Sequence, residues 1–218
     1  MPSAAAPSLL FSDTGVHMTE EAQKRAWDAF DTEAREILRA RDVMDMAAFG
    51  RAVDALKSAP RIGASGCGHS GIACRHFAHL MCCIERPARF ISPAEAVHGA
   101  SGFLQQGDVM VLVSRGGKTA ELLPIARISR EKGATVIALT ENLDSPLAQL
   151  SDIVLPMRVE RETDRYNSQG TSSFAATNAI FDALQAALIE ETGFRNEQFA
   201  LIHPGGAVGA RLNEKKDR

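Results

Sequence analysis

From residue 60 onward, short runs typical of β-strands alternate with longer stretches typical of helices, and this alternation restricts the possible folds most. Residues 109–113 form a continuous apolar run, Val-Met-Val-Leu-Val, as expected for a strand buried on both faces. Strands that alternate with helices specify a parallel sheet with helices on both faces. The expected strands are 61–64, 88–91, 109–114, 135–140 and 153–159; helices are expected at 70–85, 119–132 and 171–192, with a short turn at 145–150.

Two further helices are expected before the first strand. Thr19 can cap a helix over 19–41, because Glu20 and Glu21 place acid near the positive end of the helix dipole. A second helix, 45–58, ends before Pro60. We therefore expect a flexible arm at 1–18 and a single α/β domain over 19–218, in which 19–58 form a helical pair. The apolar stripe of the first helix requires a partner surface, and its members are Trp27, Phe30, Ala34, Ile37 and Leu38.

Composition argues for small-molecule chemistry. The formal net charge of −3 does not indicate the positively charged surface that binds nucleic acid or an anionic membrane. No stretch reaches the roughly 18 apolar residues that a membrane span requires, and the N-terminus lacks the pattern of a secretory signal. The four cysteines fall at 67, 74, 82 and 83 without zinc-type spacing. We expect reduced thiols, a cytoplasmic protein, and no metal or cofactor.

Ligands of an open parallel sheet bind beyond the carboxyl ends of its strands, where three candidate loops fall. The first, residues 66–71, reads Gly-Cys-Gly-His-Ser-Gly between a strand and a helix. Its glycines let the backbone approach an anion at the helix N-terminus. The same string fits the dinucleotide pattern GxGxxG, but the following strand ends Ile91-Ser92-Pro93 without the acid that such a site also needs.

The second loop, residues 114–119, reads Ser-Arg-Gly-Gly-Lys-Thr, and its hydroxyls, N–H groups and cations are suited to a phosphate. A capped turn with solvated Arg115 and Lys118 is the alternative. The third loop, residues 170–173, reads Gly-Thr-Ser-Ser at the start of the long last helix. Its three hydroxyls could bind a ligand or simply cap that helix.

With all three loops in one domain, the chain resembles the sugar isomerase (SIS) domain family, and most of all its arabinose-5-phosphate isomerases. The resemblance runs from about residue 27 to residue 212. It includes Pro-Ala-Glu-Ala-Val-His-Gly at 93–99 and, most specifically, His-Pro-Gly-Gly-Ala-Val-Gly at 203–209. Many of these isomerases continue into two CBS domains, which this sequence, ending at Arg218, is expected to lack.

The resemblance implies a flavodoxin-like three-layer sandwich with a five-stranded parallel sheet, in a homotetramer whose active sites lie between subunits. It implies an enzyme that binds a sugar phosphate and interconverts its aldose and ketose forms. Glu162 matches a family carboxylate suited to proton transfer, His203 a histidine that reaches a neighbouring subunit's site, and His98 a histidine near the sugar. The other substrate-binding candidates are Ser65, just before the first loop, and Gly68 within it; Ser114, Arg115 and Thr119 in the second; and Thr171, Ser172 and Ser173 in the third.

The sequence departs from the arabinose-5-phosphate isomerases at three loop positions. His69 replaces a lysine, Lys118 replaces a glutamate, and Gly116 replaces a serine. Either the catalytic roles are redistributed among other residues, or the substrate is a different phosphosugar, such as a hexulose, heptose or acid-sugar phosphate. A non-catalytic sensor of sugar phosphates is a further alternative, although residues 27–58 lack a basic recognition helix.

Isomerisation moves a proton between C2 and C1 through an enediol, so it needs a base, an acid near the carbonyl oxygen and an anchor for the phosphate. Glu162 is the expected base; the alternative is a solvated charge in the polar run 160–165. His203 is suited to ring opening or proton shuttling, because imidazole can give and take a proton near neutral pH. His69 and Lys118 are expected to stabilise the enediolate, although Lys118 could instead meet an acidic group of the substrate.

Overall fold

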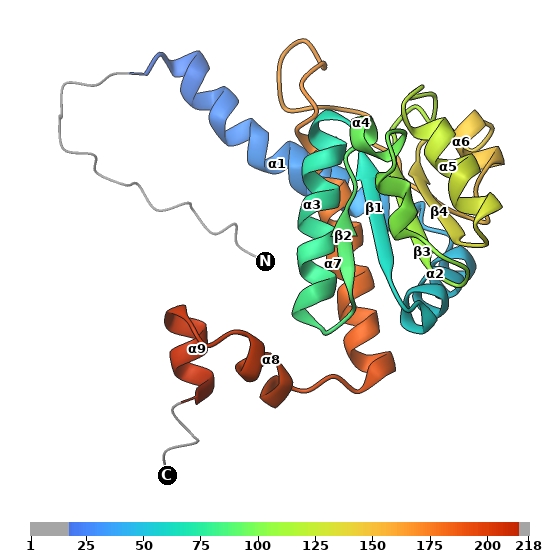
Figure 1. Cartoon of the computed structure of the whole chain (residues 1–218). Helices are drawn as coiled ribbons and strands as arrows, with labels where there is room; N and C mark the ends of the chain where they lie inside the picture. Colours follow the sequence, from blue (N-terminus) through green and yellow to red (C-terminus); the bar gives the residue numbers. More distant parts are fainter. Residues whose placement is uncertain (1–17, 214–218) are drawn as a thin grey trace.

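Five parallel strands form one sheet in the order β2-β1-β3-β4-β5 (Figure 1). The computed structural model describes residues 18–213, so nearly all of the arm expected at 1–18 lies outside the described residues. This strand order is that of flavodoxin-like, doubly wound folds, and the expected fold class is confirmed. The strands are β1 (Ile62–Gly66), β2 (Ala88–Phe90), β3 (Val109–Val113), β4 (Thr135–Thr140) and β5 (Ile153–Pro156).

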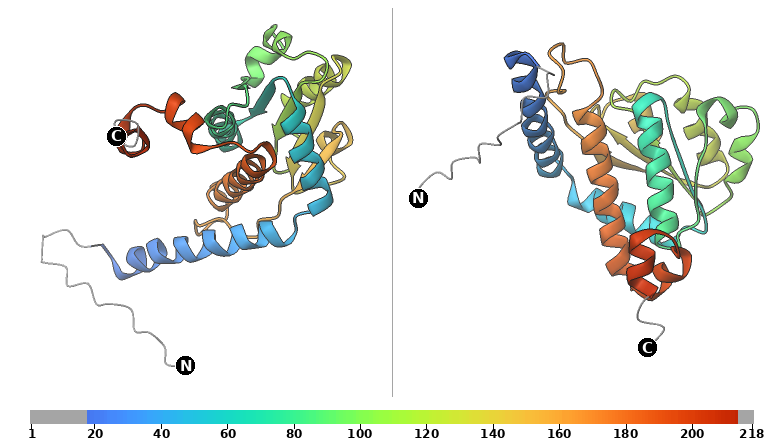
Figure 2. Two further views of the ribbon diagram at one scale, coloured as in Figure 1. Left: turned by 90° about the horizontal axis from the view of Figure 1, so that it is seen from below. Right: turned by 90° about the vertical axis from the view of Figure 1, so that its left-hand side faces the viewer.

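Helices cover both faces of the sheet (Figure 2). The helices on one side are α1 (Glu20–Asp42), α2 (Met46–Ser58), α3 (Gly68–Cys83) and α7 (Ser172–Thr192), with α1 packed against α7. The other face carries α4 (Pro93–Ala96), the 3₁₀ helix η1 (Ala100–Phe103), α5 (Leu122–Glu131) and α6 (Pro146–Gln149). Side chains of β3 alternate between the two cores: Val111 packs on the α3–α7 side, whereas Met110 and Leu112 pack on the α5 side. This alternation explains the continuous apolar run at 109–113.

The first helix begins after Thr19, the predicted capping residue, and the second begins after Asp45, which caps it in the same way. The Thr19 hydroxyl accepts a hydrogen bond from the N–H of Ala22 at 3.1 Å, and the Asp45 carboxylate accepts one from Ala47 at 2.8 Å. These bonds satisfy N–H groups that have no partner within the helix.

Two expected boundaries differ from the structure by three residues, each for a local reason. The helix expected from 119 begins at Leu122. Pro124 explains the later start, because proline has no N–H to donate and is tolerated in the first turn of a helix but not further in. The strand expected to reach 159 ends at Pro156. The backbone of Val159 instead bonds to the side chains of Arg115 and Glu141.

The two ends of the described chain extend beyond the body of the molecule. The first half of α1 carries Trp27 and Phe30, which are 59% and 68% exposed. After α7, α8 (Asn196–Ile202) and α9 (Gly206–Asn213) lie at the bottom left of Figure 1, whereas the loop before α7 lies at the top. Within residues 18–213, none of the helices has the length and apolar character needed to span a membrane.

Candidate functional site

The first loop brings α3 very close to the end of β1. A Cβ atom at Gly71 would lie 2.5 Å from the carbonyl oxygen of Gly66, so only glycine fits there. The loop also meets the third loop: a Cβ atom at Gly170 would lie 2.8 Å from Nδ1 of His69. The imidazole of His69 additionally packs against Phe174 of α7, with 5.9 Å between ring centroids. His69 therefore lies where the first and third loops meet.

The second loop closes through its hydroxyl groups. Ser114 Oγ lies 2.8 Å from Thr119 Oγ1, and the N–H of Gly117 donates to Ser114 Oγ at 3.1 Å. Gly117 has a φ of +65°, a left-handed conformation that favours glycine. Lys118 is exposed on this loop. The closed turn keeps the two hydroxyls together at the carboxyl end of β3.

In the third loop, the hydroxyls do not cap α7. Thr171 makes no side-chain capping bond to the helix; its Oγ1 accepts from the N–H of Thr163 at 2.9 Å and donates to Glu162 Oε2 at 3.2 Å. Ser172 Oγ is buried without a hydrogen-bond partner, as is Ser65 Oγ at the end of β1. Buried hydroxyls without partners are uncommon and costly, so both atoms are candidates for ligand contacts.

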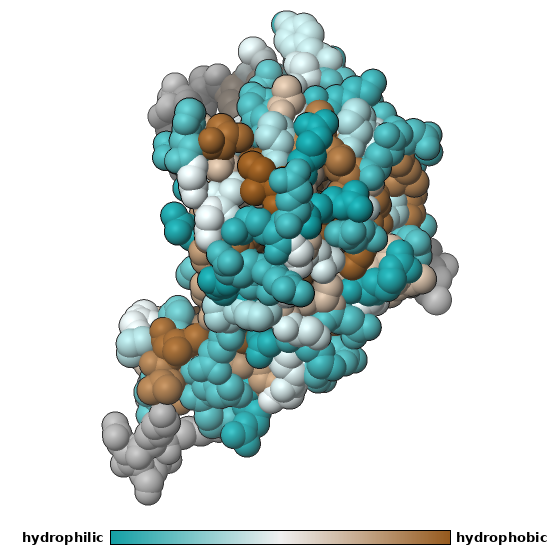
Figure 3. All heavy atoms as spheres, turned by 45° about the vertical axis from the view of Figure 1, so that its right-hand side comes forward, coloured by the Kyte–Doolittle hydropathy of each residue, from teal (hydrophilic) through white to brown (hydrophobic). Residues whose placement is uncertain are grey.

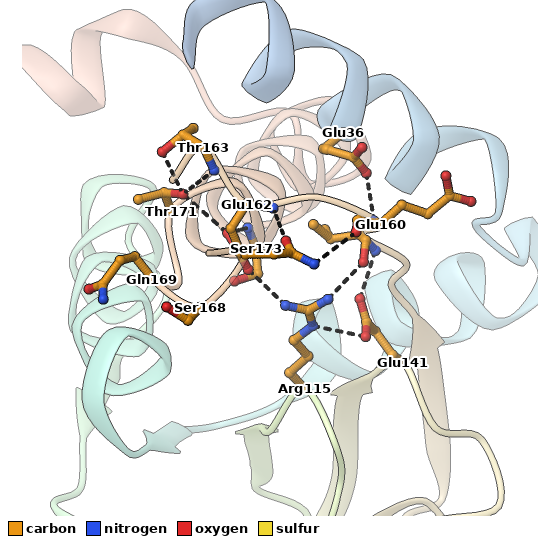
Figure 4. Close-up of polar contacts among 12 residues, drawn as sticks. Glu36, Arg115, Glu141, Glu160, Glu162, Thr163, Ser168, Gln169, Thr171 and Ser173 are labelled. Carbon is orange, nitrogen blue, oxygen red and sulfur yellow. Dashed lines mark hydrogen bonds and ion pairs between the residues drawn. The ribbon is translucent and has the colours of Figure 1, made fainter. Parts of the chain in front are cut away.

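Glu162 lies where the second and third loops meet (Figure 4). Its side chain is 1% exposed, so the alternative of a solvated charge is wrong. Oε1 accepts from Arg115 Nη1 at 2.7 Å, and Oε2 accepts from the N–H of Ser173 at 3.2 Å as well as from Thr171. The residue thus places a buried, ionisable oxygen pair beside the hydroxyls of the third loop.

The two remaining candidate histidines are not part of this cluster. His98 follows α4 and is exposed. His203 ends α8, beyond the far end of α7, where its ring packs 4.9 Å from that of Phe199 and its Nδ1 is buried without a hydrogen-bond partner. Within one copy of the chain, α8, which His203 follows, lies far from the loop before α7 that carries Glu162 (Figure 1).

An open cleft of about 710 Å³ adjoins the first loop. Its lining includes His69, Arg75 and Glu121, and Arg75 stacks over Phe90 at 4.0 Å from the ring centroid. Cys67 also lines the cleft. Burial, and secondarily the negative charge of Glu121, raise the pKa of its thiol, which argues against a reactive thiolate. The rest of the lining is Gly66, Gly68, Gly71, Ile72, Ser92, Pro93 and Ala94.

Sequence reasoning missed Glu141. This residue directly follows β4, at the same edge of the sheet as the three loops, and binds Arg115 Nε at 2.9 Å. Its position after a buried strand was a usable signal, because functional side chains gather at carboxyl ends of parallel strands. Arg75 and Glu121 gave no such signal, since both are charged residues in or beside predicted helices.

Comparisons with known proteins point to one domain family. The SIS domain profile matches residues 55–187. Arabinose 5-phosphate isomerase KdsD of Pseudomonas aeruginosa is 38% identical over 152 residues, which are 70% of this chain and 47% of KdsD. For GutQ of Escherichia coli K12, an arabinose 5-phosphate isomerase, identity is 37% over 155 residues, 71% of this chain and 48% of GutQ. The chain thus spans about half the length of the curated relatives it matches.

Two solved structures share nearly the whole described fold. A candidate sugar-phosphate isomerase from Listeria monocytogenes superposes with a TM-score of 0.83 and 38% identity, covering 87% of this chain and 100% of the other. A protein of Escherichia coli CFT073, solved in complex with A5P, has a TM-score of 0.79 and 26% identity, covering 86% and 100%. Since the family profile matches more than half of its residues, the chain belongs to the SIS domain family.

Proposed function

We propose that the chain is a sugar-phosphate aldose–ketose isomerase that acts through an enediol, with arabinose 5-phosphate as the first substrate to test. Relatives named arabinose 5-phosphate isomerases share 37–38% identity over about 70% of the chain, and one structural neighbour was solved with A5P. The departures at His69, Lys118 and Gly116 make other phosphosugars the second group to test.

The observation that carries the proposal is that the second and third loops share Glu162. Arg115 of the second loop donates to Oε1, and Ser173 of the third donates to Oε2. A group able to accept a proton therefore lies beside hydroxyls and helix N–H groups that suit a phosphate. The unpartnered hydroxyls of Ser65 and Ser172 support ligand binding here, because phosphate oxygens would accept their protons.

In this proposal Glu162 abstracts the C2 proton, and the substrate displaces the 3.2 Å contact from the Thr171 hydroxyl as it enters. His69, where the first and third loops meet, and Lys118, on the second, stabilise negative charge that develops on the enediolate oxygens. Residues that contact the phosphate and sugar in this proposal are Ser65, Gly68, Ser114, Thr119, Thr171, Ser172 and Ser173, whereas His98 lies outside this cluster.

His203 acts, in this proposal, in the site of a neighbouring copy within a cytoplasmic homotetramer. Apolar side chains are exposed on the helices that flank it: Leu201 by 71%, Ile202 by 45% and Val208 by 41%. They belong to the apolar surface at the C-terminal end of the described chain (lower left in Figure 3). Packing between copies would bury these side chains together with Trp27 and Phe30 of α1.

Proton exchange tests the activity. The protein is incubated in deuterated water with pentose, hexose and acid-sugar phosphates, and deuterium at C2 is followed by NMR together with aldose–ketose conversion. Glu162→Gln is expected to abolish exchange while sugar-phosphate binding remains. The matched control is Glu160→Gln, since Glu160 lies two residues earlier and is exposed. Binding without exchange in the unmodified protein would reject the isomerase and favour a sensor; full exchange in Glu162→Gln would reject Glu162 as the base.

A further inference from the structure

Each nitrogen of the Arg115 guanidinium donates a hydrogen bond to the protein. Nε donates to Glu141 Oε2 at 2.9 Å, Nη1 donates to Glu162 Oε1 at 2.7 Å, and Nη2 donates to the carbonyl oxygen of Val159 at 2.7 Å (Figure 4). A planar guanidinium can satisfy three acceptors in fixed directions, which the single ammonium group of lysine cannot do. Three of its five N–H groups are thus held by protein acceptors, one on each nitrogen, and this fixes the plane of the guanidinium.

Glu141 completes the arrangement from the end of β4. Its Oε1 accepts the N–H of Val159 at 2.7 Å while its Oε2 binds Arg115. The N–H and the carbonyl of Val159 are therefore held by two side chains that come from β4 and from the loop after β3. Because Val159 lies three residues before Glu162, these contacts fix the path of the backbone as well as the carboxylate.

The burial of Glu162 makes this contact consequential. A carboxylate that is 1% exposed requires a charged partner or several hydrogen-bond donors. Arg115 supplies the charged partner on Oε1, and the Oε2 atom is left with the two 3.2 Å contacts from Thr171 and Ser173. The 2.7 Å bond from Arg115 thus orients Oε1, and Oε2, with its two longer contacts, faces the third loop.

We infer that Arg115, held by Glu141, is a positioning residue that orients Glu162, and that it does not bind the substrate's phosphate. The inference rests on the proposed function only in giving Glu162 the proton-transfer role. Arg115 acts through Glu162 and does not itself contact the reacting atoms.

Arg115→Gln separates the two roles. We expect kcat for the active sugar phosphate to fall about 100-fold, as misplacement of a reacting group can cause, with KM and the dissociation constant for inorganic phosphate unchanged. Arg115→Lys should recover little, because it restores the charge without the three-way geometry. Arg158→Gln is the control: Arg158 is exposed, and its one ion pair within residues 18–213 is with Glu160, at 3.7 Å. Unchanged kcat with weaker phosphate binding in Arg115→Gln would overturn the inference.

A double variant tests whether Arg115 and Glu141 act on Glu162 as one unit. In a Glu141→Gln background, adding Arg115→Gln should cause a smaller loss of kcat than it causes alone, because residues that act as one unit are not additive. An additional loss as large as that of the single variant would overturn the inference. If Arg115→Gln does not fold, Glu141→Gln is expected to give a smaller loss of the same kind, in kcat and not in KM; a KM effect there would also contradict positioning.

A measurement without turnover keeps this inference separate from the proposed function. Hydrogen exchange of the backbone amides at 159–163 should become faster in Arg115→Gln and stay unchanged in Arg158→Gln. Unchanged exchange in Arg115→Gln would overturn the positioning role even in an active enzyme. Absence of turnover in the unmodified protein would instead reject the proposed isomerase activity. The amide hydrogen exchange would then still show whether Arg115 holds the backbone at 159–163.

Discussion

Ser114 Oγ and Thr119 Oγ1 lie 2.8 Å apart across the second loop. One of the two hydroxyl protons forms the hydrogen bond between them, and the N–H of Gly117 donates to Ser114 Oγ as well. One hydroxyl proton therefore remains for a ligand at this turn. A phosphate is a suitable acceptor, because hydrogen bonds to charged groups are stronger than those between neutral groups.

Removing the Thr119 hydroxyl is expected to weaken phosphate binding. Thr119→Val keeps the shape of the side chain and deletes one hydrogen bond to a charged group, worth about 1.5–3 kcal/mol, so the dissociation constant for inorganic phosphate should rise at least about 10-fold. Calorimetric titration measures this change. Thr135→Val, at the opposite end of the sheet, is the matched control. Equal affinity in Thr119→Val would remove Thr119 from the site.

Gly117 is expected to tolerate no side chain. Its φ of +65° disfavours other residues, and an added Cβ would overlap the side chain of Ser145. Gly117→Ala should therefore lower the free energy of unfolding by about 1–3 kcal/mol, measured by urea denaturation. The neighbouring Gly116→Ala is the control, because nothing lies within 4 Å of a Cβ there. Equal stability of both variants would contradict the geometry of this turn.

Cys67 is expected to react slowly with alkylating reagents. Its pKa is raised by burial first and by the negative charge of Glu121 second, so the thiol stays protonated at neutral pH. Alkylation by iodoacetamide should therefore become fast only at a higher pH than for an ordinary cysteine. The exposed Cys82 should react earlier, as peptide mass spectrometry can show. Glu121→Gln removes the negative charge and should speed labelling of Cys67 a few-fold. Labelling that is fastest at Cys67 in the unmodified protein would contradict this prediction.

Two inactive variants are expected to complement each other if His203 serves a neighbouring copy. Glu162→Gln and His203→Ala are each predicted to be inactive, and a co-expressed mixture should regain part of the activity because some sites then combine an intact Glu162 with an intact His203. Steady-state turnover and analytical ultracentrifugation of the mixed oligomer measure this. An oligomer that forms but stays inactive would place His203 outside the shared site.

Asp164 is expected to order the loop between Glu162 and α7. Its carboxylate accepts hydrogen bonds from the backbone N–H groups of Gln169, Ser168 and Tyr166 at 2.8–3.0 Å, which lower its pKa. A lowered pKa means that these bonds stabilise the loop at neutral pH and are lost as the pH falls through that value. Asp164→Asn should make the loop more sensitive to limited proteolysis at pH 7. The control is Asp144→Asn, whose side chain lies exposed after β4; equal cleavage in both variants would contradict this role.

Much of the fold could be predicted from local patterns. The apolar run at 109–113 predicted a buried strand because its side chains pack on both faces of the sheet. Thr19 predicted a helix start because its hydroxyl bonds a nearby free N–H group. The start of α5 was misjudged because the glycine turn looked like a helix start, and the effect of Pro124 five residues later was overlooked.

The candidate site could be predicted only in part. Its loops follow from the rule that ligands bind at carboxyl ends of parallel strands, and this rule also covered Glu141, which was nevertheless missed. Burial of Glu162 could not be foreseen, since the run Glu-Arg-Glu-Thr-Asp-Arg reads as solvated surface.

By itself, then, the sequence determined which segments form strands and helices, where glycine turns fall and which family the chain resembles, because neighbouring residues specify these features. Only the tertiary structure decided that Arg115, Glu141 and Glu162 form one bonded set around a buried carboxylate and that His203 lies far from it. The reason is that residues 26 to 47 positions apart meet only when β3, β4 and the loop after β5 pack side by side. No local pattern encodes such a contact.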